Sequence, residues 1–152
     1  MGDKMTFEQM NLDKNIIQAL HTLGYEKPLP VQEKVIPNIL SGTDCIVKSR
    51  TGSGKTASFA IPIIQNLEID ERSPQALVLT PTRELALQIQ QDFDRIGTFK
   101  KIKTLPIFGK QPFKFQKEDL KQRCHVVIGT PGRVLDHLQQ QTLDPSKIKY
   151  VV

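Results

Sequence analysis

Short apolar runs alternate with amphipathic helical patterns along most of this 152-residue sequence. Each run keeps apolar residues at consecutive positions, which is typical of strands that are buried on both faces of a parallel sheet. The runs lie at residues 45–48, 75–80, 104–108, 125–130 and 148–152. Because the first four are each followed by a helical pattern, we expect a doubly wound α/β domain with helices on both faces of a mostly parallel sheet.

The helical patterns have recognisable ends. Residues 83–96 repeat apolar side chains at helical spacing, and Gly97 is placed to end that helix. Asp13 is placed to cap the first helix and Gly24 to end it, while Pro62 predicts a kink. The predicted helices cover residues 13–23, 31–40, 55 onward, 83–96, 113–122 and 131–140.

The composition, with 38% hydrophobic and 24% charged residues, is that of an ordinary globular chain. No apolar run approaches the ~18 residues of a membrane-spanning helix, and the N-terminus lacks the apolar core of an export signal. We therefore predict a cytoplasmic protein with no membrane partner. Cys45 and Cys124 border apolar runs, so we expect both to be buried, reduced thiols.

Basic residues concentrate in one segment. The net charge is +5 and the isoelectric point is near 9.3. Residues 100–123 hold eight basic residues against two acidic ones, whereas residues 1–99 carry a small acidic excess. Such a segment fits either an anionic partner or an ordinary solvated face, and charge alone does not separate the two.

The sequence SRTGSGKT, residues 49–56, lies between a predicted strand and a predicted helix. Its glycines let backbone N–H groups turn inward around phosphate oxygens, and the N-terminus of the next helix adds positive potential. Lys55 is then placed to reach the β- and γ-phosphates, and the Thr56 hydroxyl to bind Mg²⁺. The predicted phosphate loop also includes Arg50, Thr51, Gly52, Ser53 and Gly54. The strict pattern has glycine where Ser49 stands, and the alternative is a Gly/Ser turn that happens to precede a lysine.

Three further motifs accompany this loop: GYEKPLPVQ at 24–32, PTRELA at 81–86 and TPGR at 130–133. Together with the phosphate loop, in this order and spacing, they strongly resemble the N-terminal RecA-like domain of DEAD-box RNA helicases. The resemblance covers residues 1–152, with residues 1–42 as the Q-motif region. It implies a RecA-like P-loop NTPase fold, ATP and Mg²⁺ as cofactors, and RNA, structured or ribosomal, as the partner.

The resemblance implies an adenine site in the N-terminal region. Gln32 matches the glutamine of the family's Q motif, and a side-chain amide has the chemistry to pair with adenine N6 and N7. Phe7 matches an aromatic that stacks on the base, and Lys27 falls within the same motif. Without the other motifs, Gln32 reads as a solvated helix residue and Phe7 as a core aromatic. Leu29 stands where the family usually has threonine, so a cap or contact is expected to be missing.

The resemblance also implies RNA contacts in two segments that follow predicted strands. These are Pro81, Thr82 and Arg83, and then Thr130, Pro131, Gly132 and Arg133. Both segments offer hydroxyls, N–H groups and an arginine at strand carboxyl ends, where open α/β sheets bind ligands. The alternative is that Thr82 and Thr130 only cap helices.

Gly109 is a further expected RNA contact. It is followed by Lys110 where the family commonly has a second glycine, so Lys110 either adds a phosphate contact or is simply solvated. The surrounding segment, FGKQPFKFQKEDLKQ, resembles the bacterial DbpA/YxiN type more than the eukaryotic initiation-factor type. That subgroup carries a separate C-terminal RNA-binding domain and acts in ribosome assembly.

No Asp-Glu-Ala-Asp tetrad occurs in the sequence, although ATP hydrolysis in the family requires it. The last run, KYVV, resembles the strand before that tetrad, so we expect the chain to be a C-terminally truncated piece of a longer helicase. The parent is expected to hydrolyse ATP with Lys55 and Thr56 in its catalytic site and a second RecA-like domain in cis. This chain alone is expected to bind nucleotide without hydrolysing it.

Two alternatives remain at this point. One is a non-catalytic module that binds adenine nucleotide or RNA. The other is a small P-loop kinase or GTPase, against which Gln32 and the paired PTRELA and TPGR motifs argue.

Overall fold

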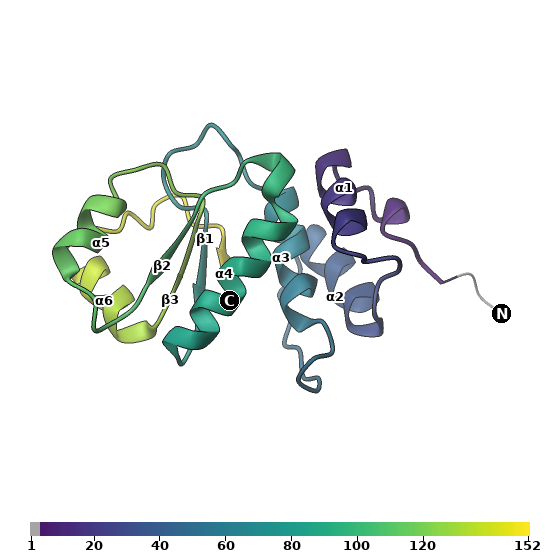
Figure 1. Cartoon of the computed structure of the whole chain (residues 1–152), viewed down its shortest axis with the longest axis horizontal. Coiled ribbons are helices and arrows are strands. Elements are labelled where there is room, and N and C mark those ends of the chain that lie inside the picture. The colour runs from purple at the N-terminus through teal and green to yellow at the C-terminus, as the bar shows by residue number, and fades with distance from the viewer. Residues whose placement is uncertain (1–3) are drawn as a thin grey trace. The chain divides into compact units, whose positions relative to one another are not determined.

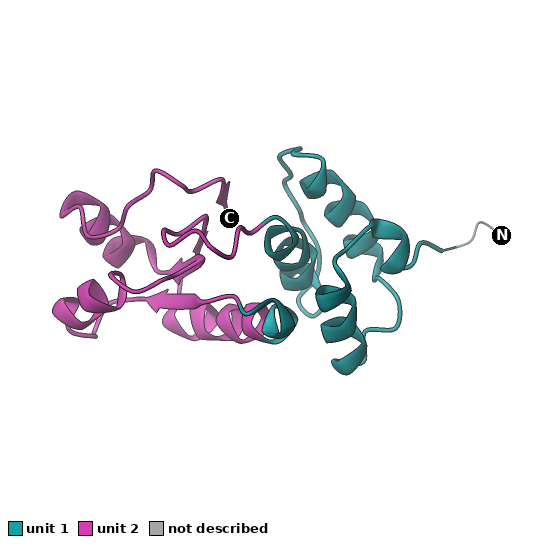
Figure 2. Ribbon diagram, turned by 90° about the horizontal axis from the view of Figure 1, so that it is seen from above, with its two compact units in different colours: residues 1–66, 95–101 teal, residues 67–94, 102–152 magenta. Residues whose placement is uncertain are grey.

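The computed structural model describes residues 4–152, which form two compact units (Figure 2). Unit 1 comprises the chain up to Asn66 together with residues 95–101, and unit 2 comprises residues 67–94 and 102–152. The first three residues of the expected ranges 1–152 and 1–42 lie outside the described part. None of the helices within residues 4–152 is both long and apolar enough to cross a membrane.

Unit 1 is built from helices (Figure 1). They are the 3-10 helix η1 (Glu8–Met10), α1 (Lys14–Thr22), α2 (Pro30–Leu40), α3 (Lys55–Gln65) and the 3-10 helix η2 (Thr98–Lys100). Each long helix buries apolar side chains, such as Ile16 and Leu20 in α1. Gly24 has φ 79° directly after α1 and ends that helix as predicted. Pro62 lies inside α3, which continues past it to Gln65.

Asp13 has a different role from the predicted helix cap. Its side chain makes no capping hydrogen bond to α1. Instead Gln65 Nε2 donates to Asp13 Oδ1 over 3.1 Å, and Lys100 Nζ lies 3.1 Å from Asp13 Oδ2. Lys100 also donates to the carbonyl oxygens of Ile64 and Gln65, each over 2.8 Å. Partial burial would raise the pKa of Asp13, but these hydrogen bonds outweigh it and lower the pKa. The carboxylate therefore joins the start of α1 to the end of α3 and to η2.

Unit 2 contains a parallel sheet of four strands in the order β2-β3-β1-β4. The strands are β1 (Ala76–Leu79), β2 (Thr104–Ile107), β3 (Val126–Gly129) and β4 (Tyr150–Val151). The helices that accompany them are α4 (Arg83–Ile96), α5 (Phe113–Asp119) and α6 (Pro131–Gln139). Four of the five predicted strands are thus confirmed with narrower bounds, and the predicted helix at 113–122 ends at Asp119.

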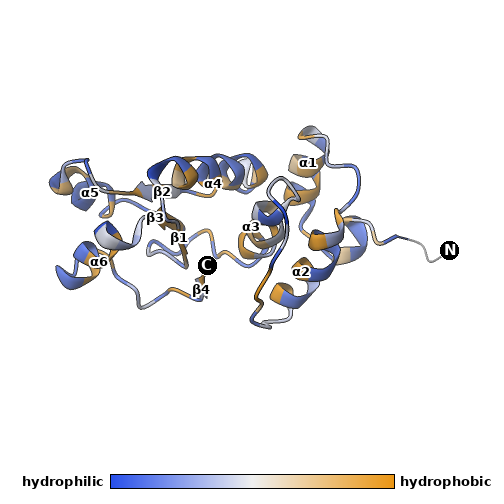
Figure 3. Cartoon of the chain, turned by 90° about the horizontal axis from the view of Figure 1, so that it is seen from below, coloured by the Kyte–Doolittle hydropathy of each residue, from blue (hydrophilic) through white to orange (hydrophobic). Residues whose placement is uncertain are grey.

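Helices cover both faces of this sheet, as the consecutive apolar positions predict. Figure 3 shows α4 on one side of the strands and α6 on the other. Val134 of α6 belongs to a core cluster with Leu77, Val127 and Ile107 from three strands. On the opposite face, Thr104 of β2 donates to Asp94 of α4 over 2.6 Å. The predicted parallel α/β arrangement is therefore confirmed in unit 2.

The predicted strand at residues 45–48 is wrong. The segment has no regular secondary structure, and Ile46 and Val47 are exposed. All four strands belong to unit 2, whereas this segment belongs to unit 1. Its backbone groups form no hydrogen bonds to other backbone groups of residues 4–152, so no strand partner stabilises an extended pairing. An apolar run alone therefore did not suffice to form a strand.

The two cysteines are expected to differ in reactivity because Cys124 is buried, as predicted, whereas Cys45 is exposed. Cys124 is buried, and burial raises its pKa to about 12. Cys45 is exposed in the segment that forms no strand. We expect a thiol reagent at pH 8 to modify one thiol in the folded chain and two after denaturation. Peptide mapping should place the fast site at Cys45. Protection of both thiols in the native chain would mean that residues 45–48 are buried after all.

Candidate functional site

The predicted phosphate loop forms a turn that leads into α3 of unit 1. Gly52 and Gly54 have φ of 79° and 87°, a left-handed conformation that favours glycine. Because α3 begins at Lys55, the N–H groups of its first turn have no intrahelical acceptor. A glycine turn at a helix N-terminus of this kind attracts phosphate oxygens.

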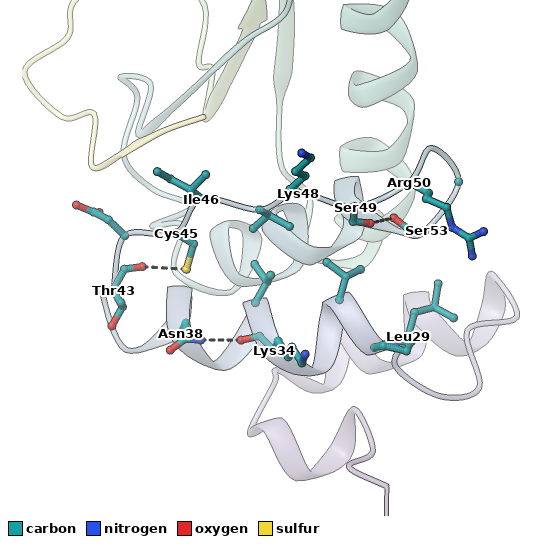
Figure 4. A pocket seen from close by; sticks show the side chains of 16 residues that line it. Leu29, Lys34, Asn38, Thr43, Cys45, Ile46, Lys48, Ser49, Arg50 and Ser53 are labelled. Carbon is teal, nitrogen blue, oxygen red and sulfur yellow. Dashed lines mark hydrogen bonds between the residues drawn. The ribbon is translucent and has the colours of Figure 1, made fainter.

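Lys55 and two serines brace the loop. Lys55 Nζ donates to the carbonyl oxygen of Ser49, and the hydroxyls of Ser49 and Ser53 share a hydrogen bond (Figure 4). Ser49, which stands where the strict pattern has glycine, thus holds the loop through both its carbonyl and its hydroxyl. A phosphate would compete for the Lys55 ammonium with a neutral carbonyl, and a charged acceptor forms the stronger hydrogen bond.

Gln32 joins the Q-motif region to this loop. Its side chain is buried, so the alternative of a solvated helix residue is wrong. Gln32 Oε1 accepts from the Leu29 N–H over 2.9 Å, and Nε2 donates to the Gly54 carbonyl over 3.3 Å. A Cβ on Gly54 would lie 2.6 Å from Gln32 Nε2 and would displace that amide, while the φ of 87° itself favours glycine. The amide keeps one N–H and one oxygen lone pair beyond these two bonds.

The remaining residues predicted to bind nucleotide fall into two groups. Lys27, Arg50 and Thr51 are exposed, and Thr56 is half-buried at the start of α3. Phe7 is only 1% exposed, so neither face of its ring is open to a base. The stacking role predicted for Phe7 is therefore not supported by this arrangement, and the ring serves as a core aromatic.

Leu29 leaves the start of α2 without a side-chain cap, as the missing threonine predicts. A cavity of about 760 Å³ lies beside this position, between α2 and residues 43–53 (Figure 4). Its lining includes Arg50, Gly52 and Ser53 of the phosphate loop but neither Gln32 nor Lys55. The cavity therefore adjoins the loop without enclosing all the predicted nucleotide contacts.

The predicted RNA-binding segments lie together at one edge of the sheet in unit 2. Leu79, Gly129 and Ile107 occupy the same register position at the ends of β1, β3 and β2. The chain continues the pairing by one residue, because the Thr80 N–H donates to Gly129 and the Thr130 N–H to Ile107, both over 2.9 Å. The segments 81–83, 108–110 and 130–133 therefore follow three neighbouring strands at their carboxyl edge.

Two threonines at this edge differ in what their hydroxyls bind. Thr82 Oγ1 accepts from the Leu85 N–H over 3.2 Å, so the predicted alternative of a helix cap is confirmed there. Thr130 precedes α6 without a side-chain capping bond, and its hydroxyl has no hydrogen-bond partner in the described part of the chain. Thr130 therefore has the more available hydroxyl.

The two arginines are both held in place. The Arg83 guanidinium lies 4.8 Å from the centroid of the Phe108 ring. Arg133 Nη1 donates to the Gln111 carbonyl over 2.7 Å and to Gln116 Oε1 over 2.9 Å. Arg133 therefore joins the segment after β3 to the loop after β2, and much of its donor capacity is used within the protein.

Gln116 and His137 are structural partners of Arg133 that the sequence did not reveal. Both are buried; His137 Nε2 lies 3.1 Å from Gln116 Oε1, and Gln116 Nε2 donates to the Phe108 carbonyl over 2.9 Å. Burial and the nearby Arg133 charge lower the pKa of His137, which keeps the imidazole neutral at pH 7. A glutamine and a histidine in separate helices carry no spacing signal that would have indicated this contact.

Comparison with known proteins identifies the family. The DEAD/DEAH box helicase family model matches residues 29–152. This chain belongs to that family. The predicted resemblance to DEAD-box helicases is thereby confirmed, and with it the RecA-like fold class.

Individual relatives agree with this assignment. The chain is 51% identical to the ATP-dependent RNA helicase DbpA of Bacillus subtilis, over 96% of this chain and 30% of that protein. A DEAD box protein from Methanococcus jannaschii is 42% identical, with a TM-score of 0.91 over 97% of this chain and 40% of that one. An S. cerevisiae Dbp5 variant bound to RNA and ADP BeF3 is 29% identical, with a TM-score of 0.87 over 96% of this chain and 37% of that one. The chain thus spans less than half the length of these relatives.

The two edge threonines are expected to respond differently to the same substitution. Thr82→Val removes a helix cap and should lower the free energy of unfolding by about 1 kcal/mol. Thr130→Val removes no side-chain hydrogen bond to the residues that the structure describes, and should change that free energy by less than about 0.5 kcal/mol. Urea unfolding of both variants measures this. Equal destabilisation would mean that Thr130 also caps its helix.

Proposed function

We propose that this chain is the adenine-nucleotide-binding and RNA-binding part of an ATP-dependent RNA helicase of the DEAD-box type. The observation that carries the nucleotide half is the contact between Gln32 and Gly54 in unit 1. It puts a side-chain amide with unused hydrogen-bonding capacity beside a glycine turn suited to phosphate. Gln32 is only 2% exposed, so the proposal requires its side chain to become accessible when a base binds.

In this proposal each part of the nucleotide has a partner. The N–H groups of Gly54, Lys55 and Thr56 face the phosphates, and Lys55 leaves the Ser49 carbonyl to bind them. The Thr56 hydroxyl, which is half-buried without a hydrogen bond to the described residues, supplies one oxygen ligand to Mg²⁺. In this proposal phosphate oxygens and water supply the other Mg²⁺ ligands, as is usual for Mg²⁺ at phosphate sites.

The RNA half of the proposal rests on the edge of the sheet in unit 2. Thr130, Gly132 and Gly109 offer a hydroxyl and backbone N–H groups, and Arg83 offers a positive charge. Groups of this kind bind phosphate and ribose oxygens without reading base sequence. We further propose that the RNA is structured or ribosomal, as the resemblance to the DbpA/YxiN type implies.

The 152-residue chain is proposed to bind ATP and not to hydrolyse it, because it contains no Asp-Glu-Ala-Asp tetrad. Hydrolysis, a second RecA-like domain in cis and a cytoplasmic location are proposed for the whole protein. A non-catalytic binding module describes the same behaviour for this chain alone. Nucleotide turnover by the chain itself would contradict the proposal.

Calorimetric titration with Mg·ADP, and with Mg·GDP as the matched control, tests the proposed nucleotide site. We expect ADP to bind at least roughly tenfold more tightly, since a bidentate amide–adenine contact is worth ~1–3 kcal/mol against the wrong base. Equal binding of both nucleotides, or a preference for GDP, would favour the P-loop kinase or GTPase alternative.

A variant pair assigns the base preference to Gln32. Gln32→Glu replaces an N–H donor by a carboxylate oxygen opposite the Gly54 carbonyl, so the ADP preference should be lost. The free energy of unfolding should also fall by about 1–3 kcal/mol, the cost of a buried polar group that loses its partner. Gln18→Glu makes the same charge change at an exposed position of α1 and should leave both quantities unchanged. Retention of the ADP preference in Gln32→Glu would remove Gln32 from the site.

A further inference from the structure

Lys110 adopts a backbone conformation that disfavours lysine. It follows β2 with φ 62°, in the left-handed region where a side chain with a Cβ is strained. The neighbouring glycine, Gly109, does not adopt the left-handed conformation in its place. A glycine at position 110 would adopt the same φ without strain. Asn11, Lys101 and Gln141 share this left-handed φ, so the use of the φ at Lys110 is experimental: Lys110→Gly removes a positive charge while relieving backbone strain.

Lys110 and Lys114 carry charges that no acidic side chain of the described residues pairs with, and Lys114 lies over the Phe115 ring. Lys110 and Lys114 are exposed, and neither forms a salt bridge or a hydrogen bond through its ammonium group to the described residues. Lys114 Nζ lies 5.3 Å from the centroid of the Phe115 ring. Phe115 is itself 58% exposed, although it is a large aromatic side chain. Farther along α5, Glu118 is paired with Lys121 over 2.8 Å.

These groups continue the edge at which the proposed RNA contacts lie. β2 is the outer strand of the sheet, so the loop after it is the last of the three neighbouring loops on that side. Arg133 binds the carbonyl of Gln111, one residue beyond Lys110, and Gln116 binds the carbonyl of Phe108, two residues before it. The start of α5 is thus fastened to the same edge by hydrogen bonds on both sides of Lys110.

We propose that Lys110, Lys114 and Phe115 extend the RNA-binding edge by one or two nucleotides of single strand. The two ammonium groups bind backbone phosphates, and the exposed Phe115 ring stacks on a base. The combination of unpaired lysines with an exposed aromatic is suited to single-stranded RNA, because phosphates and bases alternate along it. This inference rests on the proposed RNA-binding function and deepens it by adding contacts from Lys110, in the loop after β2, and from Lys114 and Phe115 in α5.

Fluorescence anisotropy with a labelled 12-nucleotide single-stranded RNA tests the proposal on the 152-residue chain. The decisive variant is Lys110→Gly, for which the two readouts should move in opposite directions. The melting temperature should rise because the strain is relieved, while RNA affinity should fall several-fold. Lys114→Gln should also weaken binding. Each lysine removed should lower the slope of log K against log salt by roughly 0.7.

Phe115→Ala separates stacking from charge. It should weaken binding by roughly fivefold or more without changing the salt slope, since base stacking does not release counterions. Lys101→Gly is the matched control, because Lys101 is a second exposed lysine with a left-handed backbone, at φ 60° after η2 of unit 1. It should raise the melting temperature and leave RNA affinity unchanged.

Thr130→Val separates a failure of the extended surface from a failure of the proposed RNA-binding function. If Thr130→Val weakens RNA binding while Lys110→Gly, Lys114→Gln and Phe115→Ala do not, the proposed function stands and the extended surface is overturned. If affinity falls equally in Lys110→Gly and Lys101→Gly, the effect is non-specific charge and the extension is likewise overturned. If the unaltered chain binds no RNA under low salt, the RNA half of the proposed function fails as well.

Discussion

The contact between Gln32 and Gly54 links the Q-motif region to the predicted phosphate loop in unit 1. The φ of 87° at Gly54 favours glycine, and the Gln32 amide occupies the space where a Cβ would project. The hydrogen bond from Gln32 to the Gly54 carbonyl then joins the first turn of α2 to the start of α3. The predicted phosphate loop is therefore held next to α3 by Gln32, the residue that we propose contacts the base.

In unit 2 the segments predicted to bind RNA are brought together by strand pairing rather than by a single side-chain contact. Parallel strands bring their carboxyl ends to the same edge, and the register makes β1, β3 and β2 end level with one another. Gly129 contributes by its lack of a side chain, because a Cβ there would lie 2.8 Å from Val134 Cγ2 in α6. The close approach of α6 fixes Thr130 and Arg133 beside the loop that follows β2.

Periodicity predicted the helices and most strands because those elements bury the apolar faces that create the pattern. Residues 83–96 form a helix with the predicted bounds for this reason. The run at 45–48 is apolar in the same way, but a strand also needs a neighbouring strand to pair with. A local stretch of sequence does not show whether such a neighbour is present. Cys45 was consequently expected to be buried, but it is exposed to solvent.

The site residues also divide into those that a local sequence pattern reveals and those that depend on contacts with distant residues. The phosphate loop and Gln32 were found by motif, because their chemistry lies in residue types at fixed spacing. Two features depend on contacts between distant residues and were not foreseen: the ion pair of Lys100 with Asp13 and the hydrogen bond that Arg133 donates to Gln116. The burial of Phe7 matches the alternative of a core aromatic. The left-handed backbone at Lys110 was not predicted, because a lysine carries no sequence signal for a positive φ.

Hydrogen–deuterium exchange across the whole chain tests the central claim that each unit holds one ligand site. With Mg·ADP, we expect slower exchange at residues 49–57 and at the start of α2, with residues 80–83 and 130–133 unchanged. With single-stranded RNA, the segments 80–83, 108–115 and 130–133 should slow instead. If Mg·ADP leaves residues 49–57 unprotected, or protects the strand-end loops of unit 2, the assignment of nucleotide to the Gln32–Gly54 contact is contradicted.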